Sequence, residues 1–224
     1  MELKAKAFVF DLNGTMIDDM YYHAEAWFNI LNNDLGAGLS WQEVKVQMYG
    51  KNDEVLSRIF GDNHFTIERM KELSIEKENR YQKAYLPQLK LMDGLLQFLD
   101  QSKTAGIKMA IGSAAIPFNI DFVLTNLNLY PYFSVVVSAD DVLISKPHPD
   151  TFLQCAEQLG VNPEDCIVFE DAPKGVESAL NAGMPCFVLT TTHPIEDFST
   201  YTNVIGYAKN YTSLKIAKDY QLNF

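Results

Sequence analysis

Asp11 is the residue whose position in this chain most directly suggests chemistry. It follows the apolar run 8–10 and precedes a turn that contains Gly14. We therefore expect it at the carboxyl end of a buried strand, where α/β proteins bind their ligands. A carboxylate there can attack phosphorus in line and form an aspartyl-phosphate, provided that the charge of the phosphate is neutralised. The plainer alternative is an aspartate that only caps a turn.

Two further motifs offer groups that could hold a phosphate. Ser113 and Ala114 follow an apolar run and open a predicted helix. A hydroxyl and free N–H groups can cradle an anion there, although a serine before a helix is more often an N-cap. Lys146 is followed by Pro147 and, two residues later, Pro149. Because these prolines restrict the backbone, the ammonium can be held in place; the alternative is a solvated loop lysine.

Glu170 and Asp171 are adjacent acids that directly follow the apolar run 166–169. Carboxylates that lie close to another acid repel one another unless a cation lies between them. Hard oxygen ligands of this kind suit Mg²⁺. The pair therefore predicts a magnesium site.

The elements that must position these residues change character along the chain. Residues 18–87 show almost no strand pattern and have helical spacing at 21–31, 41–48, 51–59 and 66–85. From residue 91, predicted helices near 94–105, 118–127, 152–159 and 176–183 alternate with strands at 108–111, 134–137, 166–169 and 186–189. A final helix is predicted at 212–219. This order predicts an α/β fold: a Rossmann-like parallel sheet core, residues 1–17 and 88–224, with an inserted all-helical cap, residues 18–87.

The motifs, in this order over residues 8–185, resemble those of the haloacid dehalogenase superfamily. The helical segment, with His23 and Trp27, resembles the β-phosphoglucomutase-like phosphatase branch of that superfamily. The resemblance implies a Mg²⁺-dependent phosphatase that acts on a small phosphorylated metabolite, such as a sugar phosphate, under a mobile cap. Asp11 would be its nucleophile.

The resemblance also implies roles for the other motif residues. Ser113 would bind the transferred phosphoryl group, and Lys146 would offset charge on the nucleophile and the phosphate. Asp171 would ligate the metal, with Glu170 assisting. Asp11 and the main-chain carbonyl of Asn13 would complete the protein's share of the metal site. The remaining expected phosphate contacts come from Gly14, Thr15 and Ala114.

Asn13 departs from the family pattern, which has a second aspartate at this position. The usual carboxylate protonates the leaving group and then activates water, a service worth roughly 10²- to 10⁴-fold. An amide can do neither. The enzyme could therefore be slow, could favour good leaving groups, could use His23 for the proton, or could carry an engineered substitution. A phosphate-ester binding protein with little turnover is a further alternative.

Several residues of the predicted cap allow more than one interpretation. His23 could take part in proton transfer or domain closure, or could be a surface or linker histidine, whereas Trp27 is expected in the cap core. Tyr49 and Lys51 belong to a segment that resembles the substrate-binding part of mutase caps, but Asp53 stands where those proteins have an arginine. Residues 115–117 are apolar where mutases have a second, basic phosphate pocket. We therefore rank β-phosphoglucomutase activity below phosphatase activity.

The composition limits the classes of partner that the protein is expected to bind. The 224 residues are 47% hydrophobic and carry a formal net charge of −11, so the surface as a whole should repel nucleic acid and anionic lipid. No apolar stretch approaches the roughly 18 residues of a membrane span, and the first residues lack the pattern of a signal peptide. The 3 cysteines lie in apolar patterns without metal-ligand spacing, as expected of buried thiols in the cytoplasm. We expect a monomer.

Overall fold

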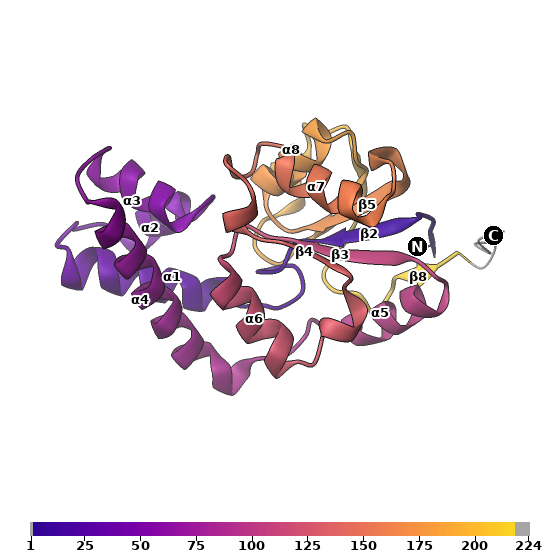
Figure 1. Ribbon diagram of the computed structural model, residues 1–224, viewed down its shortest axis with the longest axis horizontal. Helices are drawn as coiled ribbons and strands as arrows, with labels where there is room; N and C mark the ends of the chain where they lie inside the picture. Colours follow the sequence, from indigo (N-terminus) through magenta and orange to yellow (C-terminus); the bar gives the residue numbers. More distant parts are fainter. Residues whose placement is uncertain (1, 218–224) are drawn as a thin grey trace. The chain divides into compact units, whose positions relative to one another are not determined.

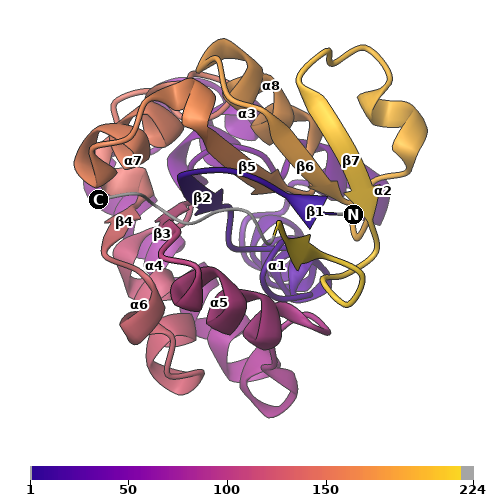
Figure 2. The ribbon, with the colours of Figure 1, turned by 90° about the vertical axis from the view of Figure 1, so that its right-hand side faces the viewer.

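The computed structural model describes residues 2–217, and its contacts divide the chain into two compact units, 1–18 with 90–224 and 19–89. The larger unit contains a six-stranded sheet in the order β4-β3-β2-β5-β6-β7 (Figures 1 and 2). All neighbouring strands are parallel. Its strands are β2 (Ala7–Phe10), β3 (Lys108–Gly112), β4 (Val135–Val137), β5 (Cys166–Glu170), β6 (Cys186–Leu189) and β7 (Val204–Ala208). The predicted α/β fold is confirmed.

Helices cover both faces of this sheet, as crossover connections between parallel strands require (Figures 1 and 2). On one face lie α7 (Asp150–Leu159) and α8 (Pro173–Asn181), and on the other lie α5 (Leu95–Thr104) and α6 (Pro117–Asn126). Single 3₁₀ turns occur at Tyr130–Tyr132, Ala139–Asp141, Pro163–Asp165 and Ile195–Phe198. The predicted helices and strands of this region are therefore present, with boundaries shifted by a few residues.

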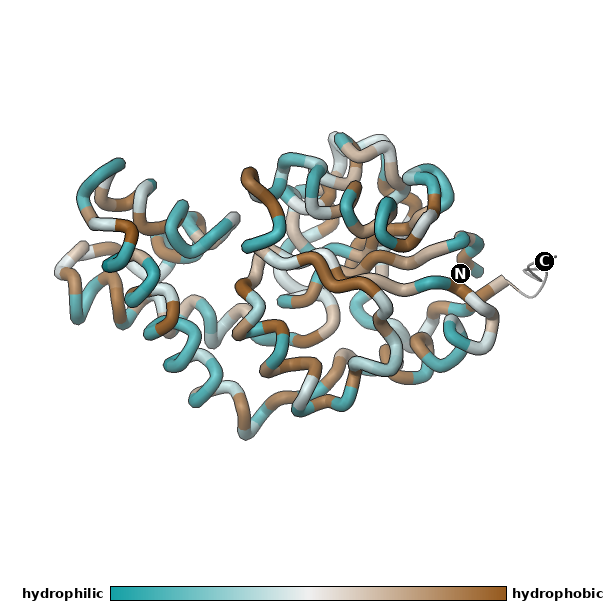
Figure 3. The backbone as a smooth tube through the Cα atoms, viewed as in Figure 1, coloured by the Kyte–Doolittle hydropathy of each residue, from teal (hydrophilic) through white to brown (hydrophobic). Residues whose placement is uncertain are grey.

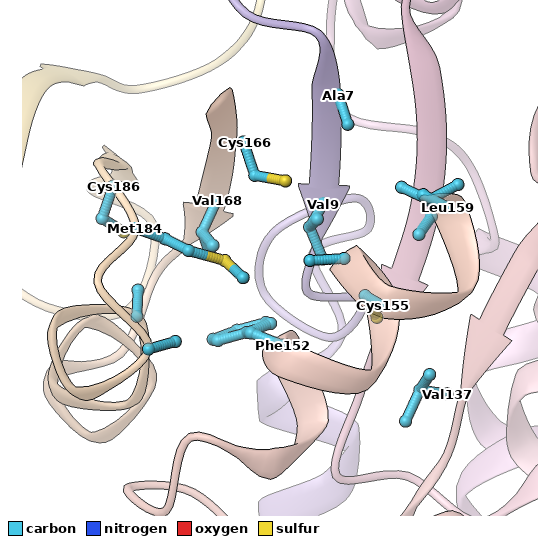
Figure 4. Close-up of a cluster of buried hydrophobic side chains, with 14 of the residues drawn as sticks. Ala7, Val9, Val137, Phe152, Cys155, Leu159, Cys166, Val168, Met184 and Cys186 are labelled. Atoms are coloured by element: carbon cyan, nitrogen blue, oxygen red, sulfur yellow. The ribbon is translucent and has the colours of Figure 1, made fainter. Parts of the chain in front are cut away.

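The alternating side chains of β2 supply a different core on each face. Ala7 and Val9 pack beneath α7 and α8, in a cluster that includes Phe152 and Cys155 (Figure 4). Phe8 and Phe10 point to the opposite face, where Phe8 stacks on Phe98 of α5 with ring centroids 5.3 Å apart. Every residue of β2 and β5 is buried, and hydrophobic residues follow the central strands in Figure 3. The two strands that carry the acidic motifs are thus fully enclosed.

The end of the chain differs from expectation. Residues 212–216 do not form the predicted helix; β8 (Lys215–Ile216) pairs in parallel with β1 (Glu2–Leu3), while residues 218 and 219 lie outside the described part. The helical prediction was wrong because the segment packs through Tyr211, whose ring is buried among Phe10, Phe98 and Phe169. Strand β7 was not predicted, since its half-exposed position at the sheet edge leaves only weak apolar alternation.

The structure describes every residue of the unit 19–89. The secondary structure of this unit consists only of helices. They are α1 (Met20–Phe28), which continues as a π-helical turn (Asn29–Asp34), α2 (Trp41–Gln47), α3 (Asn52–Phe60), α4 (Ile67–Tyr85) and a 3₁₀ turn (Leu86–Gln88). Its core contains Trp27 with Leu31, Leu56 and Leu73, so the core position expected for Trp27 is confirmed. We call residues 19–89 the helical unit.

Candidate active site

Adjacent strands bring the predicted motifs to one edge of the sheet. Phe10 of β2 is in register with Ile111 of β3 on one side and with Phe169 of β5 on the other. Asp11 directly follows β2, and its N–H donates to the carbonyl of Phe169 (3.0 Å). Parallel strands about 4.8 Å apart therefore place the residues after β2, β3 and β5 side by side at their carboxyl ends.

Three carboxylates meet at this edge. Asp11, Glu170 and Asp171 each offer an oxygen, and these atoms all lie within 4.8 Å of one another. The Nζ of Lys146 donates to Oδ1 of Asp11 (2.7 Å) and to Oε1 of Glu170 (2.8 Å). All four side chains are buried. Lys146 is therefore held in place, as its flanking prolines suggested, and is not a solvated loop lysine.

The charges of this cluster do not balance. Burial raises the pKa of Asp11 to about 7, although Lys146 opposes the rise and Glu170 adds to it. Burial likewise raises the pKa of Asp171, with the charges of Glu170 and Asp11 contributing. Burial disfavours the charged amine of Lys146, but Asp11 and Glu170 outweigh it and raise the pKa of Lys146. Three carboxylates facing one ammonium leave an excess of negative charge that suits a divalent cation with oxygen ligands.

The carboxylate of Glu170 is engaged on both oxygens. Its Oε1 accepts from Lys146, and its Oε2 accepts the N–H groups of Asp171 (2.8 Å) and Ala172 (2.9 Å). The side chain lies against Gly175 in the first turn of α8, where a Cβ would fall 1.7 Å from Oε1. Glu170 therefore joins the lysine to the start of α8.

Asp171 is held from the turn after β2. Its Oδ1 accepts from the hydroxyl of Thr15 (3.1 Å), and a Cβ on Gly14 would lie 2.2 Å from its Oδ2. Gly14 also has a φ of +78°, a conformation that side chains disfavour. The Gly-Thr turn thus contacts the second acid of the motif. Asn13, half-buried, lies in the same turn and bridges in the backbone to Ile17.

Ser113 and Ala114 lie at the end of β3, beside the end of β2. Ser113 is buried, and its hydroxyl accepts the N–H of Ala115 (3.1 Å). Helix α6 begins only at Pro117, with Ile116 as its N-cap. The expectation that Ser113 opens the helix was wrong, because Pro117 takes the first helical position and residues 113–116 form a turn before it.

His23 lies in the helical unit, buried within a polar network, so the surface-histidine alternative is excluded. Its Nδ1 accepts from the ammonium of Lys77 (2.6 Å), and its Nε2 lies 3.2 Å from Oδ2 of Asp19. The ring stacks on Tyr81 with centroids 3.7 Å apart. Lys77 also donates to Glu78 (2.9 Å). Burial opposes ionisation of Glu78, but Lys77 and His23 hold its pKa below the usual range.

Tyr49 and Lys51 lie between α2 and α3 of the same unit. Tyr49 is partly exposed, and the guanidinium of Arg58 lies 3.8 Å above its ring while donating to its carbonyl (2.6 Å). Lys51 precedes α3, and its N–H donates to Glu54 (3.0 Å). Arg58 was missed as a candidate because its contact with Tyr49 spans nine residues and belongs to no helical or strand period.

Two polar contacts of the acidic site were also missed. Thr192, after β6, contacts Asp171, and the hydroxyl of Tyr211 donates to the carbonyl of Thr15 (3.3 Å). A threonine or tyrosine after the last predicted strand carries no motif that could have singled it out.

Comparison with known proteins agrees with this geometry. The haloacid dehalogenase-like hydrolase family matches residues 5–183. The chain is 32% identical to fructose-1-phosphate phosphatase of Escherichia coli, over 79% of this chain and 92% of that protein. It is 32% identical to β-phosphoglucomutase of Bacillus subtilis, over 80% of each. A haloacid dehalogenase hydrolase of family IA from Entamoeba histolytica has a structure with a TM-score of 0.83, at 27% identity and 96% coverage of both chains.

Other observations bear on the remaining expectations. Among residues 2–217, no helix combines the length and apolar character needed to cross a membrane. The three cysteines are buried free thiols. The family match covers the acidic motifs and the helical unit alike, and the predicted hydrolase class is confirmed. The chain belongs to the haloacid dehalogenase-like hydrolases.

Proposed function

We propose that this protein hydrolyses a small phosphorylated metabolite, a sugar phosphate or a similar ester, through an aspartyl-phosphate on Asp11. The observation that carries the proposal is the buried set of Asp11, Glu170, Asp171 and Lys146 at the carboxyl ends of β2 and β5. The similarity to fructose-1-phosphate phosphatase supports a sugar phosphate as the substrate class.

The chemistry has two steps. In the first, a carboxylate oxygen of Asp11 attacks phosphorus, the ester P–O bond breaks, and the alcohol leaves after it takes up a proton. In the second, water attacks the phosphorus of the aspartyl-phosphate, releases phosphate and regenerates the carboxylate. Lys146 contacts the nucleophile and would offset negative charge in both steps. Ser113, Ala114, Gly14 and Thr15 would hold the phosphoryl oxygens.

Mg²⁺ fits the donor set of this site, since three buried carboxylates exceed the one ammonium. Asp11, Asp171 and the main-chain carbonyl of Asn13 would hold the ion, with Glu170 assisting. When bound, Mg²⁺ would neutralise charge on the phosphate. The protein's own share of this work is to keep the acids at fixed positions and away from bulk water.

The source of the proton is the least conventional part of the proposal. The amide of Asn13 cannot donate a proton to the leaving group or accept one from water. Esters with good leaving groups would therefore be hydrolysed most readily. His23 remains a proposed proton carrier, and Tyr49 and Lys51 remain proposed substrate contacts.

The similarity to β-phosphoglucomutase makes a mutase the second candidate. A mutase that works through a bisphosphate must hold two anionic groups, whereas Ala115, Ile116 and Pro117 after the proposed phosphate site are apolar or lack a donor side chain. Assaying β-glucose 1-phosphate with a catalytic amount of the bisphosphate distinguishes the two, since a mutase forms glucose 6-phosphate without net release of phosphate.

Phosphate release from a panel of sugar phosphates, acyl phosphates and nitrophenyl phosphate tests the proposal. We expect turnover with Mg²⁺, little with EDTA, and none in Asp11→Asn, whose circular dichroism should match that of the parent. If the parent binds the esters without releasing phosphate, the protein is a binding protein. Turnover of Asp11→Asn at the parent rate would remove Asp11 from the mechanism.

A further inference from the structure

The loop after β6 contacts the candidate metal site from a distant part of the sequence. The hydroxyl of Thr191 donates to the carbonyl of Gly14 (2.5 Å), 177 residues earlier in the chain. The hydroxyl of the next residue, Thr192, contacts Oδ2 of Asp171 and lies 2.9 Å from the carbonyl oxygen of Asp171. Two consecutive threonines therefore join the loop to the turn after β2 and to the acid after β5.

Thr192 completes the set of groups around the Asp171 carboxylate. Oδ1 accepts from Thr15, and Oδ2 contacts Thr192. Gly14 lies so close to this carboxylate that residue 14 has no room for a side chain. The final torsion of an aspartate is broad, so packing and hydrogen bonds must set the orientation of its carboxylate. Each oxygen has two lone-pair positions, which leaves one on each for another ligand.

The tautomer of His193 determines where the Thr192 hydroxyl can donate. That hydroxyl has one hydrogen but three acceptors within reach: Oδ2 and the carbonyl of Asp171, and Nδ1 of His193 at 2.9 Å. Nδ1 of His193 also lies 3.2 Å from the Asp171 carbonyl. When Nδ1 carries a hydrogen, Nδ1 donates to the Thr192 hydroxyl oxygen or to the Asp171 carbonyl. The Thr192 hydroxyl then donates its own hydrogen to the Asp171 carboxylate.

We propose that Thr192 is a positioning residue for Asp171 as a metal ligand, with His193 directing the Thr192 hydroxyl toward the carboxylate. The inference rests on the metal role assigned to Asp171 in the proposed function, but it adds a residue outside the acidic motifs. Hydrogen-bond partners of metal ligands typically change metal affinity by about 10- to 100-fold when they are removed. The effect should therefore appear in Mg²⁺ binding itself, without any substrate.

Calorimetric titration of the full chain with Mg²⁺ tests this. Thr192→Val keeps the side-chain shape but removes the hydroxyl, and should raise the Kd about 10- to 100-fold. Thr192→Ser restores the hydroxyl and should return the Kd to within about threefold of the parent value. Thr190→Val is the matched control, because the Thr190 hydroxyl is directed at the carbonyl of Ala208 and its loss should leave the Kd unchanged. His193→Ala should have an intermediate effect.

The outcomes separate this inference from the proposed function. A Kd for Thr192→Val equal to that of the parent, or no recovery in Thr192→Ser, overturns the role of Thr192 while leaving phosphate hydrolysis intact. A parent chain that does not bind Mg²⁺ overturns both. The expected Kd pattern without phosphate release supports the inference and overturns the hydrolase proposal. Melting curves in EDTA, which should agree among the variants, exclude a general loss of structure.

Discussion

In the proposed mechanism, Asn13 limits the proton transfers available, because it carries an amide where the family pattern has a carboxyl group. Replacement by aspartate, Asn13→Asp, should raise the hydrolysis of esters with poor leaving groups by about 10²-fold or more. Nitrophenyl phosphate should gain less, since its leaving group departs without protonation. Steady-state phosphate release with both substrate classes measures the difference.

Two results would contradict that expectation. Equal gains for both substrate classes would mean that the new carboxylate acts on water in the second step and not on the leaving group. No gain for either class would indicate that another group already supplies the proton, and His23→Ala would then identify or exclude His23.

The two adjacent acids should differ in their contribution to metal binding. Both oxygens of Glu170 accept from Lys146 or from backbone N–H groups, whereas Asp171 receives only hydroxyl contacts among those described. Asp171→Asn should therefore raise the Kd for Mg²⁺ more than Glu170→Gln does. Calorimetric titration of both variants measures this, and a reversed order would mean that Glu170 is the main ligand.

At the scale of elements, the packing of α8 against Glu170 requires that residue 175 has no side chain. Replacing a glycine inside a helix with alanine normally stabilises the folded protein by roughly 0.5–1 kcal/mol. At Gly175 the added Cβ would fall 1.7 Å from Oε1 of Glu170, whose carboxylate is fixed by Lys146 and by two N–H groups. We expect Gly175→Ala to destabilise the protein by about 1–3 kcal/mol and to lower turnover.

Urea denaturation and phosphate release together check the Gly175 prediction. Lys174→Ala is the matched control, because Lys174 is an exposed neighbour on the same helix and its replacement should change stability by at most about 0.5 kcal/mol. A Gly175→Ala protein that is more stable and fully active would show that Glu170 can move without consequence for the site.

For the molecule as a whole, the acidic cluster should link stability to pH. Burial raises the pKa of Asp11 from 3.8 to about 7, so between these values the folded state binds a proton that the unfolded chain lacks. The stability of the metal-free protein should therefore rise as pH falls from 8 to 6. The lowered pKa of Glu78 acts in the opposite direction, but only below its ordinary value of 4.5.

Mg²⁺ should oppose this pH dependence, because it competes with protons for the same oxygens. The rise in Tm on adding Mg²⁺ should be larger at pH 8 than at pH 6, and about 2.7 kcal/mol of stability is expected at 100 times the Kd. Calorimetric scans with Mg²⁺ and with EDTA at both pH values provide the measurement. Asp171→Asn is the control. If Mg²⁺ raises the Tm of this variant and of the parent equally, the metal binds at another site.

The fold and the acidic motifs could be predicted from the sequence because their signals are local. Asp11 directly follows a fully apolar strand, whereas Glu170 ends β5 after the apolar residues 166–169 and Asp171 comes next. Parallel pairing of those strands then brings the acids together without further information. Alternation of helix and strand likewise predicted the six-stranded sheet except for its edge strand β7. The paired strands β1 and β8 were not predicted either, because short or half-exposed segments carry little pattern.

The tertiary structure decided which polar groups contact each other within the acidic site and within the helical unit. Lys146 bonds to Asp11 across 135 residues, Thr192 contacts Asp171 from a loop without a motif, and His23 meets Lys77 across 54 residues. Each contact depends on how separate elements pack, and a single hydroxyl or ammonium leaves no periodic trace in the sequence. Sequence therefore determined where the three carboxylates lie, and packing determined their orientation and raised the pKa of Asp11 and of Asp171.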